Sequence, residues 1–168
     1  EDGILRHHAS GRSVLGICGG YQMLGREIAD PLGLEGAPST VKGLGLLDVT
    51  TVMEPEKAVR NIEAESQLFG ARIKGYEIHI GRTSGNDCAR PFSSGGDHGD
   101  GAVSSDGKAM GTYLHGLFGS DDFRAEFLRS LGINTGPSDY WAGVDTALDG
   151  IAAELDALGL GAVLDAAR

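Results

Sequence analysis

The sequence predicts an α/β fold in which helices cover an open, mostly parallel three-layer sheet. One observation is that Val14–Ile17 is a continuous apolar run of strand length, typical of a strand covered on both faces. A second is that helical spacing follows almost at once, from Tyr21 to Ile28. A strand, a sharp turn and a helix in this order form the repeating unit of parallel sheets.

The segments around this unit predict further strands. A short helical pattern at 4–8 precedes it, and Gly11 follows that pattern where helices commonly end. The glycines and prolines of Asp30–Lys42 predict a loop. Strands rich in β-branched residues are then expected over Leu44–Met53, Lys57–Glu63 and Ile73–Ile80.

The second half of the chain predicts a loop, a hairpin and two helices. Gly81–Asp100 has the glycine content of a surface loop. Asp106-Gly107 lies between two apolar runs, a strong hairpin signal. Capped and amphipathic patterns predict helices over Asp121–Leu131 and Trp141–Ala167.

Composition excludes several classes of protein. The 168 residues fit one domain, and a net charge of -10 without a basic run argues against nucleic acid as a partner. The longest apolar runs fall far short of the roughly 20 residues that cross a membrane, and no signal peptide is visible. The two cysteines, Cys18 and Cys88, are expected as thiols of a cytoplasmic protein. No P-loop or metal-ligand spacing occurs, so no metal site is expected.

A candidate nucleophile lies between the first strand and the next helix. Residues 16–20 read Gly-Ile-Cys-Gly-Gly, the form of a nucleophile elbow with a thiol in place of the hydroxyl. The helix N-terminus favours the Cys18 thiolate, and the backbone N–H of Gly19 points to where an oxyanion would form. The alternative is a buried structural cysteine in a tight turn.

A cysteine nucleophile needs a partner that moves protons, usually histidine. Of the five histidines, His115 stands at the end of an expected strand and is followed by Gly116. Catalytic groups of open α/β sheets gather at the carboxyl ends of strands, where Cys18 also lies. His115 is therefore the candidate base, against the alternative of a hydrogen-bonded core or turn histidine.

Three segments in one order, residues 16–25, 75–83 and 111–118, resemble the glutamine amidotransferase domains of the cobyric acid synthase family. The closing helical segment is similar too, so the resemblance covers residues 1–168. It implies a flavodoxin-like class I glutamine amidotransferase fold. It also implies that Cys18 attacks the side-chain amide of glutamine and that His115 protonates the departing ammonia.

The resemblance assigns further residues to the glutamine site. Gln22, four residues after the nucleophile, matches a position that contacts bound glutamine. Tyr76, Glu77 and His79 match a strand that lines the glutamine pocket. The alternatives are an ion pair of Glu77 with Arg82 and a purely structural His79.

One departure from the wider superfamily concerns the histidine. Many class I amidotransferases carry a glutamate two residues after it, where this sequence has Leu117. Either Cys18 and His115 act without a local acid, or a group from elsewhere, for example Glu77, orients the histidine.

By this resemblance the chain is an N-terminally truncated part of a longer enzyme. Missing are the opening strands, which would supply a second oxyanion donor, and an ATP-dependent synthetase domain that holds ATP and Mg²⁺ and binds the corrinoid. Ammonia would pass to that domain and amidate adenosylcobyrinic acid a,c-diamide to adenosylcobyric acid, in cobalamin biosynthesis. Weak or no activity is expected of the fragment alone.

Three alternatives stay open. The related cobyrinic acid a,c-diamide synthase has the same elbow and acts earlier on the corrin. A non-catalytic flavodoxin-like binding module would keep Cys18 buried and unreactive. A cysteine peptidase uses a similar elbow, although Gln22 and the 75–79 segment favour glutamine.

Overall fold

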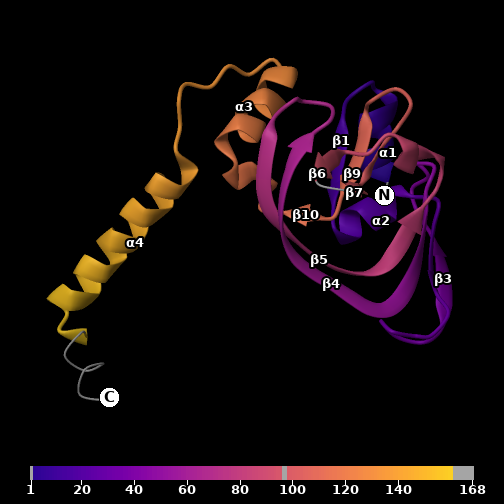
Figure 1. Ribbon diagram of the computed structural model, residues 1–168, viewed down its shortest axis with the longest axis horizontal. Helices are drawn as coiled ribbons and strands as arrows, with labels where there is room; N and C mark the ends of the chain where they lie inside the picture. Colours follow the sequence, from indigo (N-terminus) through magenta and orange to yellow (C-terminus); the bar gives the residue numbers. More distant parts are fainter. Residues whose placement is uncertain (1, 96–97, 161–168) are drawn as a thin grey trace.

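The computed structural model describes residues 2–95 and 98–160 and confirms the α/β class (Figure 1). Its strands form two open, mixed sheets, so the expectation of a mostly parallel sheet is wrong. Among the described strand pairs, β1 with β9 and β2 with β4 run parallel, and the other six run antiparallel. The main reason is that residues 67–71 join the two longest strands directly, and so short a link permits only antiparallel pairing.

The smaller sheet contains the predicted first strand. Its order is β1-β9-β8, with β1 parallel to β9 and Gly16 opposite Gly111. β8 and β9 form the hairpin expected around Asp106-Gly107. The elements are α1 (Asp2–Ala9), β1 (Val14–Ile17), α2 (Gly19–Leu24), β8 (Ala102–Val103) and β9 (Ala109–Thr112).

The larger sheet is built around two long strands that curve together (Figure 1). Its order is β10-β5-β4-β2-β3, with β6 paired to β4 and β7 paired to β6. The strands are β2 (Glu27–Asp30), β3 (Ser39–Lys42), β4 (Thr50–Ser66), β5 (Arg72–Ser84), β6 (Ser93–Gly95), β7 (His98–Asp100) and β10 (Leu114–His115).

The helix after the nucleophile is shorter than expected. It ends at Leu24 because Gly25 continues in an extended conformation, with φ -67° and ψ -175°. A Cβ at Gly25 would lie 2.8 Å from the carbonyl oxygen of Val49, so this close approach requires glycine. The chain then forms β2, and β3 occupies the end of the segment predicted as a loop.

Two expected strands in the middle of the chain are one strand. β4 is continuous, and its register against β5 shifts between Val52 and Lys57. Pro55 lies inside this shift and has no N–H to donate, which explains the interruption in the pattern. The segment Gly81–Asp100, predicted as a loop, contains the end of β5, a 3₁₀ helix η1 (Asn86–Ala89), β6 and β7.

Two clusters of buried side chains form the core. One packs Phe92, Met110 and Leu114 against Phe123 of α3 (Asp121–Ser130), with Leu117 of the 3₁₀ helix η2 (Leu117–Gly119). The other gathers around Tyr21 and Tyr113, whose rings meet edge to face. Tyr21 and Leu24 of the second cluster lie on α2, the helix that follows Cys18.

The last described helix, α4 (Tyr140–Ala157), extends away from both sheets (Figure 1). Asp139 caps it by accepting a hydrogen bond from the Ala142 N–H, and none of its residues is buried. The expected helix ran to Ala167, of which residues 161–167 lie outside the described part. No described helix is long and apolar enough to span a membrane.

Candidate active site

Cys18 occupies the sharp turn between β1 and α2. Its φ of 54° and ψ of -118° are strained for a residue with a side chain, and no other non-glycine residue in the described ranges has a positive φ. A Cβ at Gly16 would lie 2.6 Å from the carbonyl oxygen of Gly20. Glycine at 16 therefore lets α2 fold back against β1 and brings Cys18 to the turn.

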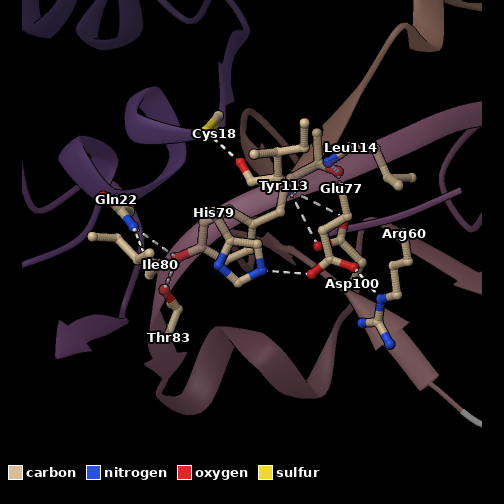
Figure 2. A network of polar contacts seen from close by, with 12 residues as sticks. Cys18, Gln22, Arg60, Glu77, His79, Ile80, Thr83, Asp100, Tyr113 and Leu114 are labelled. Carbon is tan, nitrogen blue, oxygen red and sulfur yellow. Dashed lines mark hydrogen bonds and ion pairs between the residues drawn. The ribbon is translucent and has the colours of Figure 1, made fainter. Parts of the chain in front are cut away.

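The backbone N–H groups of Cys18 and Gly19 differ in whether they have a hydrogen-bond acceptor. The Cys18 N–H donates to the carbonyl oxygen of Thr112 at 2.8 Å, which fixes the turn to β9. Its Sγ lies 3.5 Å from the carbonyl oxygen of Ile78 on β5 (Figure 2). Gly19 is exposed, and within the described residues its N–H has no hydrogen-bond acceptor. Its role as an oxyanion donor stays a prediction.

His115 lies on β10, which continues from β9 and pairs with β5 so that His115 faces Tyr76. Ile17 pairs with Thr112 at the end of β9, so Cys18 follows β1 beside a strand end that lies three residues before His115 in the sequence. Among the described residues no hydrogen bond joins the Cys18 Sγ to His115. The His115 Nε2 is buried and without a partner there.

Glu77 belongs to a different network from the one predicted. Its carboxylate accepts hydrogen bonds from Arg60 Nε at 2.6 Å and from His79 Nε2 at 2.5 Å (Figure 2). Arg82, the partner considered from the sequence, instead lies 3.7 Å from Glu54. Glu77 forms no hydrogen bond to His115, because the β4–β5 pairing places Arg60 directly opposite it.

His79 packs flat against Tyr113, with ring centroids 3.6 Å apart. The Tyr113 hydroxyl in turn lies 2.6 Å from the Thr83 hydroxyl. His79 Nδ1 is buried without a partner among the described atoms. The structure therefore gives His79 a place in this polar network, and a contact with glutamine stays a prediction.

Gln22 joins the same network from α2. Its side-chain amide donates to the Tyr113 hydroxyl and to the carbonyl oxygen of Ile80, both at 3.2 Å (Figure 2). Gln22 also lines a cavity of about 390 Å³ together with Asp30 and Met53. Cys18 and His115 do not line this cavity.

Sequence reasoning missed Asp100, Arg60 and Tyr113. Asp100 accepts hydrogen bonds from the Thr112 hydroxyl and the Tyr113 N–H. Burial raises the pKa of Asp100, and these hydrogen bonds only partly oppose the rise. It lines a second cavity of about 350 Å³ with Arg60, Glu77, His79 and Tyr113. Of these three residues, only Tyr113 could have been found from the sequence, because it lies within the segment 111–118 that resembles the family.

The ionisation of Glu77 makes the stability of the domain depend on pH. Burial opposes its charge, but hydrogen bonds from Arg60 and His79 outweigh burial and lower the Glu77 pKa below its ordinary value. The native state therefore binds fewer protons than the unfolded chain. Glu77 contributes stability above its ordinary pKa of about 4.3, and this contribution is lost as pH falls through the lower native pKa.

We expect Glu77→Gln to destabilise the domain most at pH 7 and progressively less toward pH 3. Urea unfolding at a series of pH values measures the difference from the unmodified chain. The charge of Glu77 also raises the pKa of Asp100, so the difference reports the ionisation of Glu77 together with its coupling to Asp100. Glu63→Gln is the control, because the ion pair of Glu63 with Lys74 is exposed and contributes little. A deficit in Glu77→Gln that is independent of pH would contradict the prediction.

Within residues 2–95 and 98–160, no group of three or more His, Cys, Asp or Glu side chains is arranged to hold a metal ion. The resemblance places Mg²⁺ and ATP in a synthetase domain outside this chain.

Comparison with known proteins agrees with the interpretation of the Cys18 turn as a nucleophile elbow. A model of the CobB/CobQ-like glutamine amidotransferase domain matches residues 1–123. A cobyric acid synthase of Brucella canis is 58% identical over 154 residues, which are 92% of this chain and 32% of that protein. One of Brucella abortus strain S19 is 56% identical over 161 residues, which are 94% of this chain and 33% of that protein.

The chain spans about a third of the length of these curated relatives. The family match includes β1, the Cys18 turn, the β4–β5 hairpin and His115. A match over so much of the chain, together with the cysteine at a strained strand-to-helix turn, shows that this chain belongs to the CobB/CobQ-like family of glutamine amidotransferase domains.

Proposed function

We propose that this chain is the glutaminase part of a cobyric acid synthase, with Cys18 as the nucleophile and His115 as the acid and base. The observation that carries the proposal is the turn at Cys18. Its strained backbone, the helix that begins at the next residue and the exposed Gly19 N–H form the arrangement that thiol nucleophiles use.

The reaction begins when His115 accepts the proton of the Cys18 thiol and the resulting thiolate attacks the side-chain amide carbon of glutamine. The carbonyl oxygen gains negative charge, which the Gly19 N–H stabilises. The intermediate collapses when the C–N bond breaks, and a proton from His115 lets nitrogen leave as ammonia. A thioester between Cys18 and the glutamyl group remains.

Water then attacks the thioester and His115 accepts its proton. The carbon–sulfur bond breaks to release glutamate and the Cys18 thiolate, which His115 protonates again to restore the thiol. The unpaired, buried Nε2 of His115 supports this role. A buried ring nitrogen without a hydrogen-bond partner destabilises the folded state, and a bound substrate or water would supply the missing hydrogen bond.

The proposal extends to the longer polypeptide that the relatives suggest. Ammonia would pass to a synthetase part outside this chain, where ATP and Mg²⁺ activate a corrinoid carboxylate for amidation. The relatives named cobyric acid synthase favour adenosylcobyrinic acid a,c-diamide as the corrinoid. β1 is an edge strand of its sheet, and further strands paired with it would give the three-layer flavodoxin-like domain and a second oxyanion donor.

A glutamine analogue with an electrophilic diazoketone in place of the amide tests the proposal. It is applied to this chain and to the polypeptide extended to the length of the relatives, followed by intact-mass and peptide mapping. We expect an adduct on Cys18, none on Cys88, and none after Cys18→Ser. Because loss of one oxyanion donor costs about 10²–10³ in rate, glutamine turnover should be much faster in the extended polypeptide.

Labelling of Cys18 in both proteins, or in the extended one alone, supports a glutamine site at this turn. Labelling of neither would overturn the proposal in favour of a binding module with an unreactive thiol. Equal turnover by the two proteins would contradict only the prediction that the oxyanion hole of this chain is incomplete. It would not contradict the glutaminase assignment.

A further inference from the structure

No acid in the described part of the chain orients His115. The position where many class I amidotransferases have a glutamate is Leu117, and its side chain is buried in the core. Glu77, the other carboxylate considered, is occupied by Arg60 and His79. Neither ring nitrogen of His115 forms a hydrogen bond to another described residue. The ring orientation must therefore come from a contact of another kind.

That contact is with Tyr76. The two residues are directly opposite in the antiparallel β5–β10 pair, and their rings stack with centroids 5.1 Å apart and planes inclined by 6°. Tyr76 is 44% exposed, so its ring covers the histidine rather than filling the core. A nearly parallel, offset pair is one of the geometries that aromatic rings prefer.

The backbone is shaped to permit this stack. A Cβ at Gly75 would lie 2.1 Å from the carbonyl oxygen of His115, so β10 approaches β5 this closely only at a glycine. On the other side, Gly116 has a φ of 76°, which turns the chain away immediately after the histidine. Gly75 and Gly116 therefore flank the ring pair, and they permit the close approach of the two strands and the turn that follows.

We propose that Tyr76 is a positioning residue, whose ring fixes the plane of the His115 imidazole where other class I amidotransferases use a carboxylate. The inference rests on the proposed function. Rotation of the imidazole about its bond to Cβ would break the flat contact with Tyr76. The stack therefore holds the ring, and with it the buried Nε2 that has no partner among the described residues, in one orientation. The contact uses the face of the tyrosine ring and not its hydroxyl.

Kinetics of glutamine hydrolysis test the proposal in the full polypeptide that carries this domain. Tyr76→Leu should lower kcat about tenfold or more while KM for glutamine stays within about twofold, since misplacing a catalytic group slows chemistry rather than binding. Tyr76→Phe keeps the ring and should restore most of the rate. Tyr140→Leu is the matched control, because Tyr140 is a similarly exposed tyrosine, 47%, on α4.

A raised KM with unchanged kcat in Tyr76→Leu would overturn the proposal and make Tyr76 a glutamine contact. So would an unchanged kcat, or a loss of rate in Tyr76→Phe as large as in Tyr76→Leu. A readout independent of activity is the NMR signal of the His115 ring protons. The Tyr76 ring current should shift these signals in the unmodified protein and in Tyr76→Phe, and the shift should vanish in Tyr76→Leu.

The diazoketone reaction separates this inference from the proposed function. If the unmodified protein is labelled at Cys18 and Tyr76→Leu keeps its kcat, only the role of Tyr76 is wrong. If the unmodified protein is neither labelled nor active, the glutaminase assignment fails, and the positioning role fails with it.

Discussion

Replacing Cys18 with serine should lower kcat for glutamine hydrolysis by about 10³-fold or more, because the thiolate forms the covalent intermediate. The turn geometry stays the same in this variant, since the Gly16 approach and the Thr112 hydrogen bond involve backbone atoms. A loss of this size therefore reports the chemistry of sulfur and not a change of fold. Steady-state assays of glutamate release measure it.

Cys88→Ser is the control for this loss. Cys88 is the only other cysteine of the chain, and its Sγ lies 3.8 Å from the Tyr21 hydroxyl, with no hydrogen bond to Cys18 or His115 among the described residues. The Cys88→Ser variant should retain full activity.

Adding His115→Asn to Cys18→Ser should lower kcat little further, because the losses of rate from two groups that act in one step are not additive. A Cys18→Ser enzyme with more than a tenth of the original rate would refute the assignment of the nucleophile.

Gly111→Ala should destabilise the domain by about 1–3 kcal/mol or more. A Cβ at this position would lie 1.9 Å from Cδ2 of Tyr21, whose side chain is only 1% exposed. β9 is buried along its whole length, so neither the strand nor the ring has space to move. Urea unfolding at neutral pH measures the change in the free energy of unfolding.

Gly143→Ala is the matched control, since nothing lies within 4 Å of a Cβ built there on α4. It should be neutral, or stabilising by up to about 1 kcal/mol through helix propensity. Combining Gly111→Ala with Tyr21→Leu tests the cause, because a smaller residue at 21 removes the clash. The double variant should lose less stability than the sum of the two single variants. If the two losses of stability were strictly additive, the destabilisation by Gly111→Ala would not come from a clash with Tyr21.

The elements closest to the candidate site were predictable because short-range chemistry determines them. The Gly-Ile-Cys-Gly-Gly run can form only a tight strand-to-helix turn, and the hairpin at Asp106-Gly107 follows from its turn residues. His115 at a strand end was visible for the same reason. These features depend on a few consecutive residues.

The pairing of distant strands was not predictable from spacing. Arg60 meets Glu77 only because β4 and β5 form one long hairpin, and Pro55 made β4 look like two strands. Asp100 reaches Thr112 from a segment whose glycine content resembled a surface loop. The prediction of mostly parallel strands was wrong for a similar reason, because an apolar strand such as β1, which lies at the edge of its sheet, does not specify the direction of the other strands.

The chain passes from the smaller sheet to the larger one at Tyr113, between β9 and β10. Cys18 therefore belongs to one sheet and His115 to the other. The alignment of the two groups is a property of how the sheets lie against each other, and neither strand sets it alone. β5 touches both groups, because it pairs with β10 at His115 and presents the Ile78 carbonyl oxygen to the Cys18 Sγ. A variant that bends the long β4–β5 hairpin would therefore change the separation of nucleophile and histidine without replacing either residue.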